Sequence, residues 1–573
     1  MKNIFSLFIG IILSASSFAQ QTPFEKSGGK ESATYFQAIE FYKNLDKVSS
    51  KIFMKEMGPT DAGYPLHLVL ISNDANFDPV QWHKENKAII LINNGIHPGE
   101  PDGIDASMML VRDIANGKMK LPDNVAMAFI PIYNIGGCLN RNSYSRANQN
   151  GPIEYGFRGN SQNLDLNRDF TKCDTREARS FTQIFHFLNP DILIDNHVSD
   201  GADYQHTMTL LTTQYDKLGA DLGAWLRDKF EPAVYKSMTE KKWDLVPYVN
   251  FETSAPGNGM QQFYDPPRYS SGYAALFQTI AFMPETHMLK PFSDRVRSTY
   301  ALMQTMIEQA GLNAGELISL RKKAMNDVAV RTSFPLTWNV DSSKNSMVTF
   351  KGYEQAFKTS DATGLQRMYY DRSKPFTKEI KYYNVFAPEN FVSKPRAYII
   401  PHGWEQVIEL LKINNVTTRQ FSNDTTIEVQ VYHIDDYKSA PRAYEKHHKN
   451  YDVKVSSSVQ KIKFLKGDYI ILLNQPTNRY IVEMLDPTGD DSFFSWNFFD
   501  GILQQKEGYS DYRWEDLAAD VLKNDPVLKQ KMEEKKKNDA KFAGNASAQL
   551  DFIYKNSPYY EPAHLRYPVY RLN

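Results

Sequence analysis

His97 and Glu100 follow directly on an apolar run, and their side-chain types suit a metal ion. The run Ala88–Ile92 is typical of a buried parallel strand, and the Asn-Asn-Gly that follows it signals a turn. Pro98 fits the first turn of a helix, which the later apolar period also predicts. A His and a carboxylate three residues apart at such a turn can point at one ion. Zinc accepts this pair, and a catalytic zinc site needs a third protein ligand.

A second predicted strand supplies a candidate for that third ligand. His197 follows the apolar residues 192–194, so it lies where another strand of the same sheet ends. In open α/β sheets, sites gather at the carboxyl ends of the strands. We therefore expect His97, Glu100 and His197 to hold one ion.

The chain contains another His-x-x-Glu pair, which needs a separate explanation. His402 and Glu405 also follow an apolar strand-like run. No strand-end His and later Glu complete this second pair. We expect these two residues only to begin a helix after a strand.

Glu285 has the position expected of a general base. It follows the apolar run 280–283, so its carboxylate is expected to be partly removed from water. Desolvation raises the pKa of a carboxylate towards the range that is useful for activating water. The alternative is a glutamate that simply precedes the helix predicted from residue 292.

An Asn-Arg pair, Asn167 and Arg168, lies beside a long Gly- and Asn-rich loop, residues 134–163. Arginine offers a planar fork that suits a carboxylate. Arg158 is a second cation that can polarise a carbonyl or hold an oxyanion. Asp165 can accept the free N–H of a metal-bound His. Alternatively, Arg158 and Arg168 pair only with Asp165 or Asp169.

Taken in order, these features resemble the zinc carboxypeptidase family, the carboxypeptidase A-like metallopeptidases. The ordered set is His-x-x-Glu, then Leu-Asp-Leu-Asn-Arg-Asp-Phe, then a strand-end His and a strand-end Glu. The resemblance covers roughly residues 30–325. It implies a three-layer α/β/α sandwich around a mixed sheet, with one catalytic Zn²⁺ per chain.

The resemblance also implies roles for individual residues. The metal ligands are His97, Glu100 and His197, and the general base is Glu285. Asn167 and Arg168 become the clamp for the free carboxylate of the substrate. Arg158 becomes the contact for the oxyanion, and Asp165 becomes the hydrogen-bond partner of a ligand His.

A mobile tyrosine of the family has no clear counterpart here. Tyr264, Tyr269 and Tyr273 are candidates, and no motif chooses among them. We predict Tyr269, with Arg268 beside it, as a contact for an anionic substrate. The spacing of Arg158 also differs from that in the digestive carboxypeptidases.

The length of the chain and the order of its expected helices and strands predict more than one domain. The chain has 573 residues, too many for one core. Helices and strands alternate through the first half, which is typical of an α/β sheet with helices on its faces. From about residue 334 short strands rich in Tyr, Val and Thr appear. We predict a catalytic domain over residues 20–330 and a β-rich α+β accessory domain over residues 335–573.

Residues 1–19 have the pattern of a secretory signal peptide, with a basic start, an apolar centre and cleavage near Ala19. We therefore expect a periplasmic or extracellular protein with no stable membrane insertion after cleavage. The net charge of −1 argues against a nucleic-acid partner. Cys138 and Cys173 could form a disulfide or remain free thiols.

These observations predict an exported zinc metallocarboxypeptidase that acts on peptides with a free C-terminal carboxylate. One alternative keeps the site but changes the substrate, as an amidase or endopeptidase on cell-wall stem peptides. Another is a non-catalytic binding protein on the same scaffold. Retention of the ligands and of Glu285 argues against that last alternative.

Overall fold

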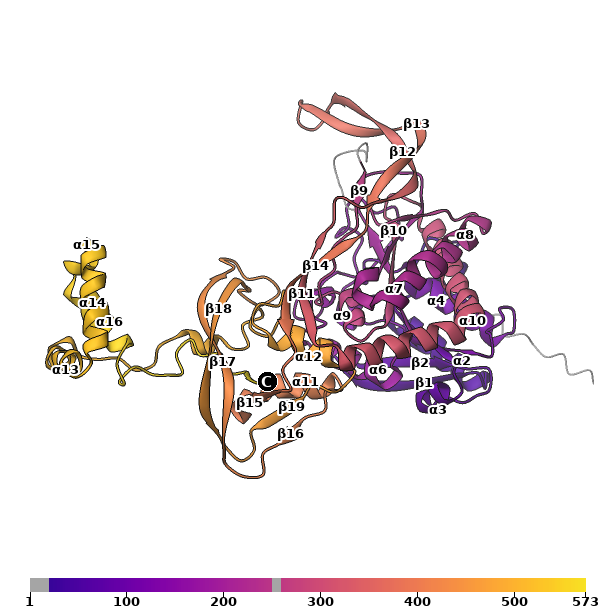
Figure 1. The fold of residues 1–573 in the computed structure, drawn as a ribbon. Coiled ribbons are helices and arrows are strands. Elements are labelled where there is room, and N and C mark those ends of the chain that lie inside the picture. Colours follow the sequence, from indigo (N-terminus) through magenta and orange to yellow (C-terminus); the bar gives the residue numbers. More distant parts are fainter. Residues whose placement is uncertain (1–19, 250–258) are drawn as a thin grey trace, which may run out of the picture. The chain divides into compact units, whose positions relative to one another are not determined.

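The computed structural model describes residues 20–249 and 259–573 (Figure 1). The predicted signal peptide, residues 1–19, lies outside them. The chain divides into two compact units: the first comprises the chain up to Arg331 with Thr337–Phe391 and Ile413–Asn415, and the second comprises the rest. The contacts thus group Thr337–Phe391 with the first unit, and the domains predicted from sequence covered residues 20–330 and 335–573.

A nine-stranded mixed sheet forms the centre of the first unit. Its strand order is β1-β2-β4-β3-β5-β10-β7-β8, and β6 pairs with β10. Strands β4, β3, β5 and β10 run parallel, so their carboxyl ends lie at one edge of the sheet. The strands are β1 (Ile52–Pro59), β2 (Pro65–Ile71), β3 (Ala88–Asn93), β4 (Val125–Ile130), β5 (Ile192–Asp195), β6 (His197–Ser199), β7 (Met208–Thr212), β8 (Leu245–Pro247) and β10 (Ile280–His287).

Helices cover both faces of this sheet, so its central strands are buried. Ile90 and Ile92 of β3 belong to one core with α4 and α10, whereas the intervening Leu91 faces the side that α6 contacts. The helices of the first unit are α1 (Pro23–Lys26), α2 (Tyr35–Val48), α3 (Pro79–Lys84), α4 (Asp102–Ala115), α5 (Ile135–Leu139), η1 (Leu166–Arg168), α6 (Arg176–Leu188), η2 (Tyr215–Leu218), α7 (Ala220–Trp225), η3 (Leu226–Phe230), α8 (Glu231–Glu240), α9 (Ser270–Leu276) and α10 (Phe292–Val330).

The start of α4 is fixed by a buried ion pair. Arg295 of α10 is fully buried, and its Nε donates to Oδ2 of Asp102 at 3.0 Å. Thr286 of β10 donates to the same carboxylate. Because Asp102 comes two residues after Glu100, these bonds hold the segment that links β3 to α4 against β10.

Four further strands follow α10, and they include a long hairpin. Strands β12 and β13 pair antiparallel along most of their lengths, and the end of β13 pairs with β9 of the first unit. Strands β11 and β14 form a separate two-stranded ribbon. The four strands are β11 (Ser333–Val340), β12 (Ser346–Thr359), β13 (Gln366–Tyr383) and β14 (Phe386–Ser393), and their partner β9 is Met260–Gln261.

The second unit is built on a six-stranded sheet with the order β16-β19-β15-β20-β17-β18. Its strands are β15 (Ala397–Ile400), β16 (Arg419–Gln420), β17 (Thr425–Ser439), β18 (Asn450–Phe464), β19 (Tyr469–Leu472) and β20 (Tyr570–Leu572). The helices in this part of the chain are η4 (His402–Trp404), α11 (Glu405–Ile413), α12 (Asn478–Leu485), η5 (Asp500–Leu503), α13 (Asp511–Asn524), α14 (Pro526–Asn538), α15 (Ala540–Ala543) and α16 (Ala546–Lys555).

The predicted fold class is confirmed: a mixed sheet with helices on its faces is followed by a strand-rich C-terminal region. His402 and Glu405 begin the short helix η4 and α11 after strand β15, as predicted. Cys138 and Cys173 are both buried and form no disulfide, so the second of the two alternatives, free thiols, is the one present. Within the described ranges, every helix is too short or too polar to cross a lipid bilayer.

Candidate active site and metal centre

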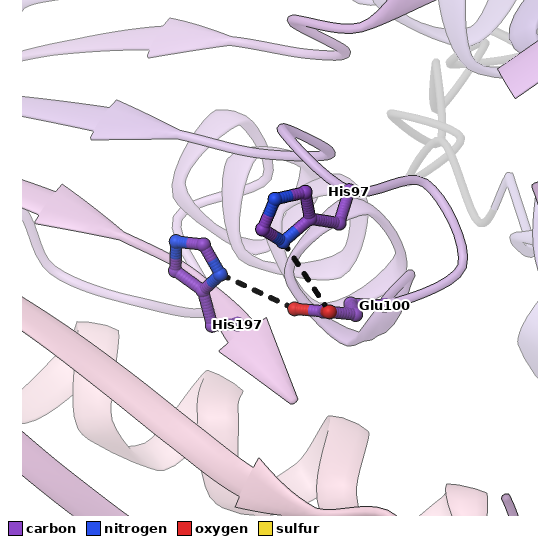
Figure 2. Close-up of side chains that lie close together, drawn as sticks. All are labelled: His97, Glu100 and His197. Atoms are coloured by element: carbon purple, nitrogen blue, oxygen red, sulfur yellow. Dashed lines mark hydrogen bonds and ion pairs between the residues drawn. The ribbon is translucent and has the colours of Figure 1, made fainter. Parts of the chain in front are cut away.

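His97, Glu100 and His197 meet at the carboxyl edge of the parallel strands (Figure 2). Nδ1 of His97 lies 3.3 Å from Oε1 of Glu100, and Nδ1 of His197 lies 3.2 Å from Oε2. One ligand atom from each residue lies within 4.8 Å of the other two, and all three side chains are buried. In the part of the chain that the structure describes, this is the one group of three or more such side chains that could hold a metal ion.

Each imidazole is oriented by a carboxylate on its far side. Nε2 of His97 lies 2.8 Å from Oδ1 of Asp165, and Nε2 of His197 lies 3.1 Å from Oδ2 of Asp195. When these Nε2 atoms carry the protons, both Nδ1 atoms present lone pairs to the same point. Nδ1 of His97 is buried and makes no hydrogen bond in this structure. Two imidazole nitrogens and a carboxylate therefore fit a zinc ion.

The sheet positions both ends of this group. Asn93, the last residue of β3, pairs in register with Asp195 of β5, and its side-chain amide donates to Oδ1 of Asp195 at 3.0 Å. The turn after β3 bends at Gly95, whose φ of +65° suits a residue without Cβ. The backbone N–H of Val198 donates to Oε2 of Glu100 at 2.8 Å, which ties the two ligand segments together.

Glu285 lies beside the candidate metal ligand His197. Strand β10 pairs in parallel with β6, and Glu285 stands in register with His197. Burial raises the pKa of Glu285 to about 8; the nearby His197 charge opposes this rise and the Glu100 charge adds to it. A divalent cation at the ligands would lower this pKa, because a nearby positive charge favours the carboxylate.

One cavity of about 480 Å³ is lined by the three candidate metal ligands, by Glu285 and by most of the predicted substrate contacts. Arg158, Asn167 and Arg168 line it. The lining also includes apolar side chains, among them Leu211 of β7, which pairs in register with Met283 of β10. The lining therefore combines the candidate metal ligands with cationic and apolar side chains.

Arg158 and Arg168 both contact neighbouring groups of the site. Nη2 of Arg158 lies 2.8 Å from Oδ2 of Asp165, and its Nη1 lies 3.5 Å from Oε1 of Glu100. Arg168 stacks on the ring of Tyr269, with 4.3 Å from its Cζ to the ring centroid. Burial opposes ionisation of Asp165, but the charges of His97, Arg158 and Arg168 outweigh it and lower the pKa of Asp165. The ion pair between Arg158 and Asp165, which the structural alternative predicted, is thus present, and Arg158 lines the cavity as well.

The three candidate tyrosines lie in different places. Tyr269 lines the cavity, whereas Tyr264 and Tyr273 are not among the described residues that do so. The hydroxyl of Tyr273 is buried and donates to Oδ1 of Asn414 at 2.7 Å. Arg268 is also outside the cavity lining, with its Cζ 6.0 Å from the ring centroid of Tyr269.

Three residues of the site were not predicted. Asp195 carried a usable signal, because it lies two residues before His197, and the carboxylate can therefore reach the same side of the chain. Arg146 comes from the unpatterned loop, and its Nη1 donates to Oε1 of Glu100 at 2.9 Å. Tyr248 lines the cavity next to Phe263, with ring centroids 6.1 Å apart. Neither had a sequence signal that we could use.

The chain is similar to known carboxypeptidases in sequence. Residues 39–213 match the zinc carboxypeptidase family. Carboxypeptidase 2 of Trichophyton rubrum is 20% identical over 512 residues, which cover 84% of this chain and 86% of the fungal protein. Carboxypeptidase 2 of Trichophyton tonsurans is 20% identical over 456 residues, covering 74% and 76%.

Two bacterial proteins are among the solved structures that match the chain. A metallo-carboxypeptidase from Burkholderia cenocepacia has a TM-score of 0.36 and 14% identity, covering 49% of this chain and 69% of its own. A metallo-carboxypeptidase from Pseudomonas aeruginosa, in complex with (2-guanidinoethylmercapto)succinic acid, has a TM-score of 0.37 and 13% identity, covering 50% and 70%.

Proposed function

We propose that this chain, a hydrolase of the metallopeptidase class whose residues 39–213 belong to the zinc carboxypeptidase family, is an exported zinc-dependent carboxypeptidase. Its substrates are peptides with a free C-terminal carboxylate. The observation that carries the proposal is the convergence of the His97, Glu100 and His197 ligand atoms in the same cavity as Glu285 and Arg168.

The three buried side chains are the proposed holders of one Zn²⁺ per chain. Bound there, zinc acts as a Lewis acid and makes water more acidic. The carboxylates of Asp165 and Asp195 keep the two imidazoles in the orientation that this requires. No additional cofactor is needed for hydrolysis.

Glu285 is the proposed general base and acid. Its carboxylate takes a proton from the attacking water and then gives it to the amine of the departing C-terminal residue. The carboxyl group returns to its starting state, so the reaction consumes one water for each peptide bond. Partial burial of Glu285 supports this role because it brings the pKa towards neutrality.

The cationic side of the cavity supports recognition of a chain end. Arg168, held by its stack on Tyr269, offers its guanidinium to the terminal carboxylate, and Asn167 lies beside it. Arg158 is the proposed contact for the oxyanion that develops on the scissile carbonyl. Arg268 enters this scheme only as a more distant cation, because the described cavity lining does not include it.

Export is the part of the proposal that depends on sequence alone. Residues 1–19 have the signal-peptide pattern, and cleavage near Ala19 would release the chain into the periplasm or the medium. Neither a nucleic acid nor a membrane is proposed as a partner.

The test uses matched peptides that differ only at the C-terminus. Purified zinc-loaded protein is incubated with peptides carrying a free carboxylate and with their C-terminal amides, and the products are identified by mass spectrometry. We expect stepwise loss of C-terminal residues from the free peptides, and only a small residual rate on the amides. Cleavage of bacterial stem peptides alone, or cleavage within amidated chains, would replace the proposal with a cell-wall amidase or endopeptidase.

A further inference from the structure

One guanidinium joins the two segments that carry the metal-binding side chains. Nη1 of Arg146 donates to Oε1 of Glu100 at 2.9 Å, and its Nη2 donates to the carbonyl of Val198 at 3.1 Å. Val198 is the residue directly after His197. Nε of Arg146 donates to Oε1 of Gln149 at 2.6 Å. The planar fork of an arginine can serve three acceptors in this way, which the single ammonium of a lysine cannot do in the same geometry.

The turn between His97 and Glu100 is shaped to admit this side chain. A Cβ on Gly99 would lie 2.8 Å from Cδ of Arg146 and 3.1 Å from the carbonyl oxygen of Gly156. Any larger residue at position 99 would therefore displace Arg146. Glycine at this position and the arginine that passes over it form one packed arrangement.

The loop that carries Arg146 is itself held in place. The side-chain amide of Gln149 donates to the carbonyl of Gly99 at 2.9 Å. The buried Arg295 donates to the carbonyl of Gly151 at 2.9 Å. The backbone N–H of Arg146 donates to the hydroxyl of Tyr155 at 3.1 Å. The guanidinium is thus anchored from both ends of its loop, and its side chain is only 14% exposed.

We propose that Arg146 is a positioning residue for the metal centre: it sets the Glu100 carboxylate and fixes the His197 segment relative to it. This assigns a role to part of the long Gly- and Asn-rich loop. Arg158 differs, because it is 45% exposed and its Nη1 lies further from Glu100, at 3.5 Å. A guanidinium beside a dication is repelled by it, so Arg146 contributes through ligand geometry and not through its charge.

This inference rests on the proposed zinc-dependent function, but its first measurement needs no substrate. The zinc dissociation constant is measured by competition with a chromophoric chelator, for wild type and for Arg146→Met. Loss of contacts that orient a ligand typically weakens metal binding about 10- to 100-fold, and we expect a loss in that range. Wild-type protein that binds no zinc would overturn the proposed function; wild type that binds zinc as tightly as the variant does would overturn only the role of Arg146.

The matched control is Arg141→Met, on the same loop. Arg141 donates to the carbonyls of Glu154, Ser32 and Ala33, and none of these is a metal ligand. Removing its guanidinium is expected to leave the zinc dissociation constant within about twofold of wild type. A loss equal to that of Arg146→Met would show that any anchor of this loop acts alike, and would contradict the specific role.

A second readout reports the geometry of the ligands directly. Co²⁺ is loaded in place of zinc, and its visible absorption is compared between wild type, Arg146→Lys and Arg146→Met. We expect a changed spectrum in Arg146→Met and an intermediate one in Arg146→Lys, because lysine keeps the charge but not the fork. If Arg146→Met does not fold, as judged by thermal unfolding of the metal-free protein, Arg146→Lys decides: a wild-type spectrum and zinc affinity in that variant would overturn the proposal.

Discussion

Oδ2 of Asp195 lies 3.1 Å from Nε2 of His197, two residues further along the chain. The same relationship joins Asp165 to His97 at 2.8 Å, although these two residues are far apart in the sequence. Both imidazoles consequently turn Nδ1 towards Glu100. Each predicted ligand His thus has a carboxylate behind it that selects the metal-binding tautomer.

Removing the charge behind His197 is expected to weaken metal binding. Asp195→Asn keeps an acceptor for Nε2–H but makes the imidazole less basic, so the zinc dissociation constant should rise about 10-fold or more. Chelator competition measures it. Asp200→Asn is the control, because Asp200 lines the cavity rim but contacts Asn148 instead of a ligand. Equal zinc affinity in wild type and Asp195→Asn would disprove the orienting role.

Metal removal is expected to abolish hydrolysis reversibly. Treatment with 1,10-phenanthroline followed by gel filtration should leave inactive protein, and one equivalent of Zn²⁺ should restore activity. Mg²⁺ should not restore it, because two imidazoles and one carboxylate do not provide the oxygen-rich octahedral site that Mg²⁺ prefers. Full activity of protein shown to be metal-free would argue against a metal-dependent reaction.

Arg168 is expected to discriminate between free and blocked chain ends. In Arg168→Met the kcat/KM for a free peptide should fall about 10- to 100-fold, the loss expected for one charge-assisted hydrogen bond. The residual rate on the matching C-terminal amide should stay unchanged. Steady-state kinetics on the two peptides measures the ratio. An equal loss on both peptides would mean that Arg168 supports the structure of the cavity instead of recognising the carboxylate.

Asp105 of α4 is expected to make stability depend on pH. Burial raises its pKa to about 7, from about 4 in the unfolded chain. The folded protein therefore holds this proton more tightly, and stability is lost as the pH rises from about 4 to about 7. Asp105→Asn resembles the protonated form and escapes this loss. Its free energy of unfolding relative to wild type should rise by up to about 4 kcal/mol across that range.

Urea unfolding of both proteins at pH 4.5 and pH 8.5 tests this prediction. Asp105 accepts a hydrogen bond from the N–H of Ala33, which the side-chain oxygen of asparagine can also accept. The comparison therefore isolates the effect of ionising Asp105 on stability. A difference between the two proteins that stays constant with pH would show that folding does not raise the pKa of Asp105.

Most of the sheet, and the residues that converge at its edge, could be predicted because local sequence determines them. His97 and Glu100 follow strand β3, His197 follows β5, and Glu285 lies close to the end of β10. Parallel strands bring their carboxyl ends together. Arg146 could not be predicted in this way, because its position depends on long-range bonds from an aperiodic loop.

The grouping of the chain into units could not be predicted for a related reason. The composition changes near residue 334, but strand β13 pairs with β9 about 120 residues earlier, through Tyr382 and Met260. Pairing over such separations leaves no local pattern. The contacts of the pocket side chains with one another, such as Arg168 on Tyr269, are equally invisible to periodicity.

The most direct test of the account compares wild type with Glu285→Gln on one peptide mixture. Both proteins are first shown to contain one zinc, and their products are then followed by mass spectrometry. We predict stepwise C-terminal trimming by wild type and a rate roughly 10²- to 10⁴-fold lower in the variant, the usual contribution of a general base. Undiminished trimming by zinc-loaded Glu285→Gln would contradict the account.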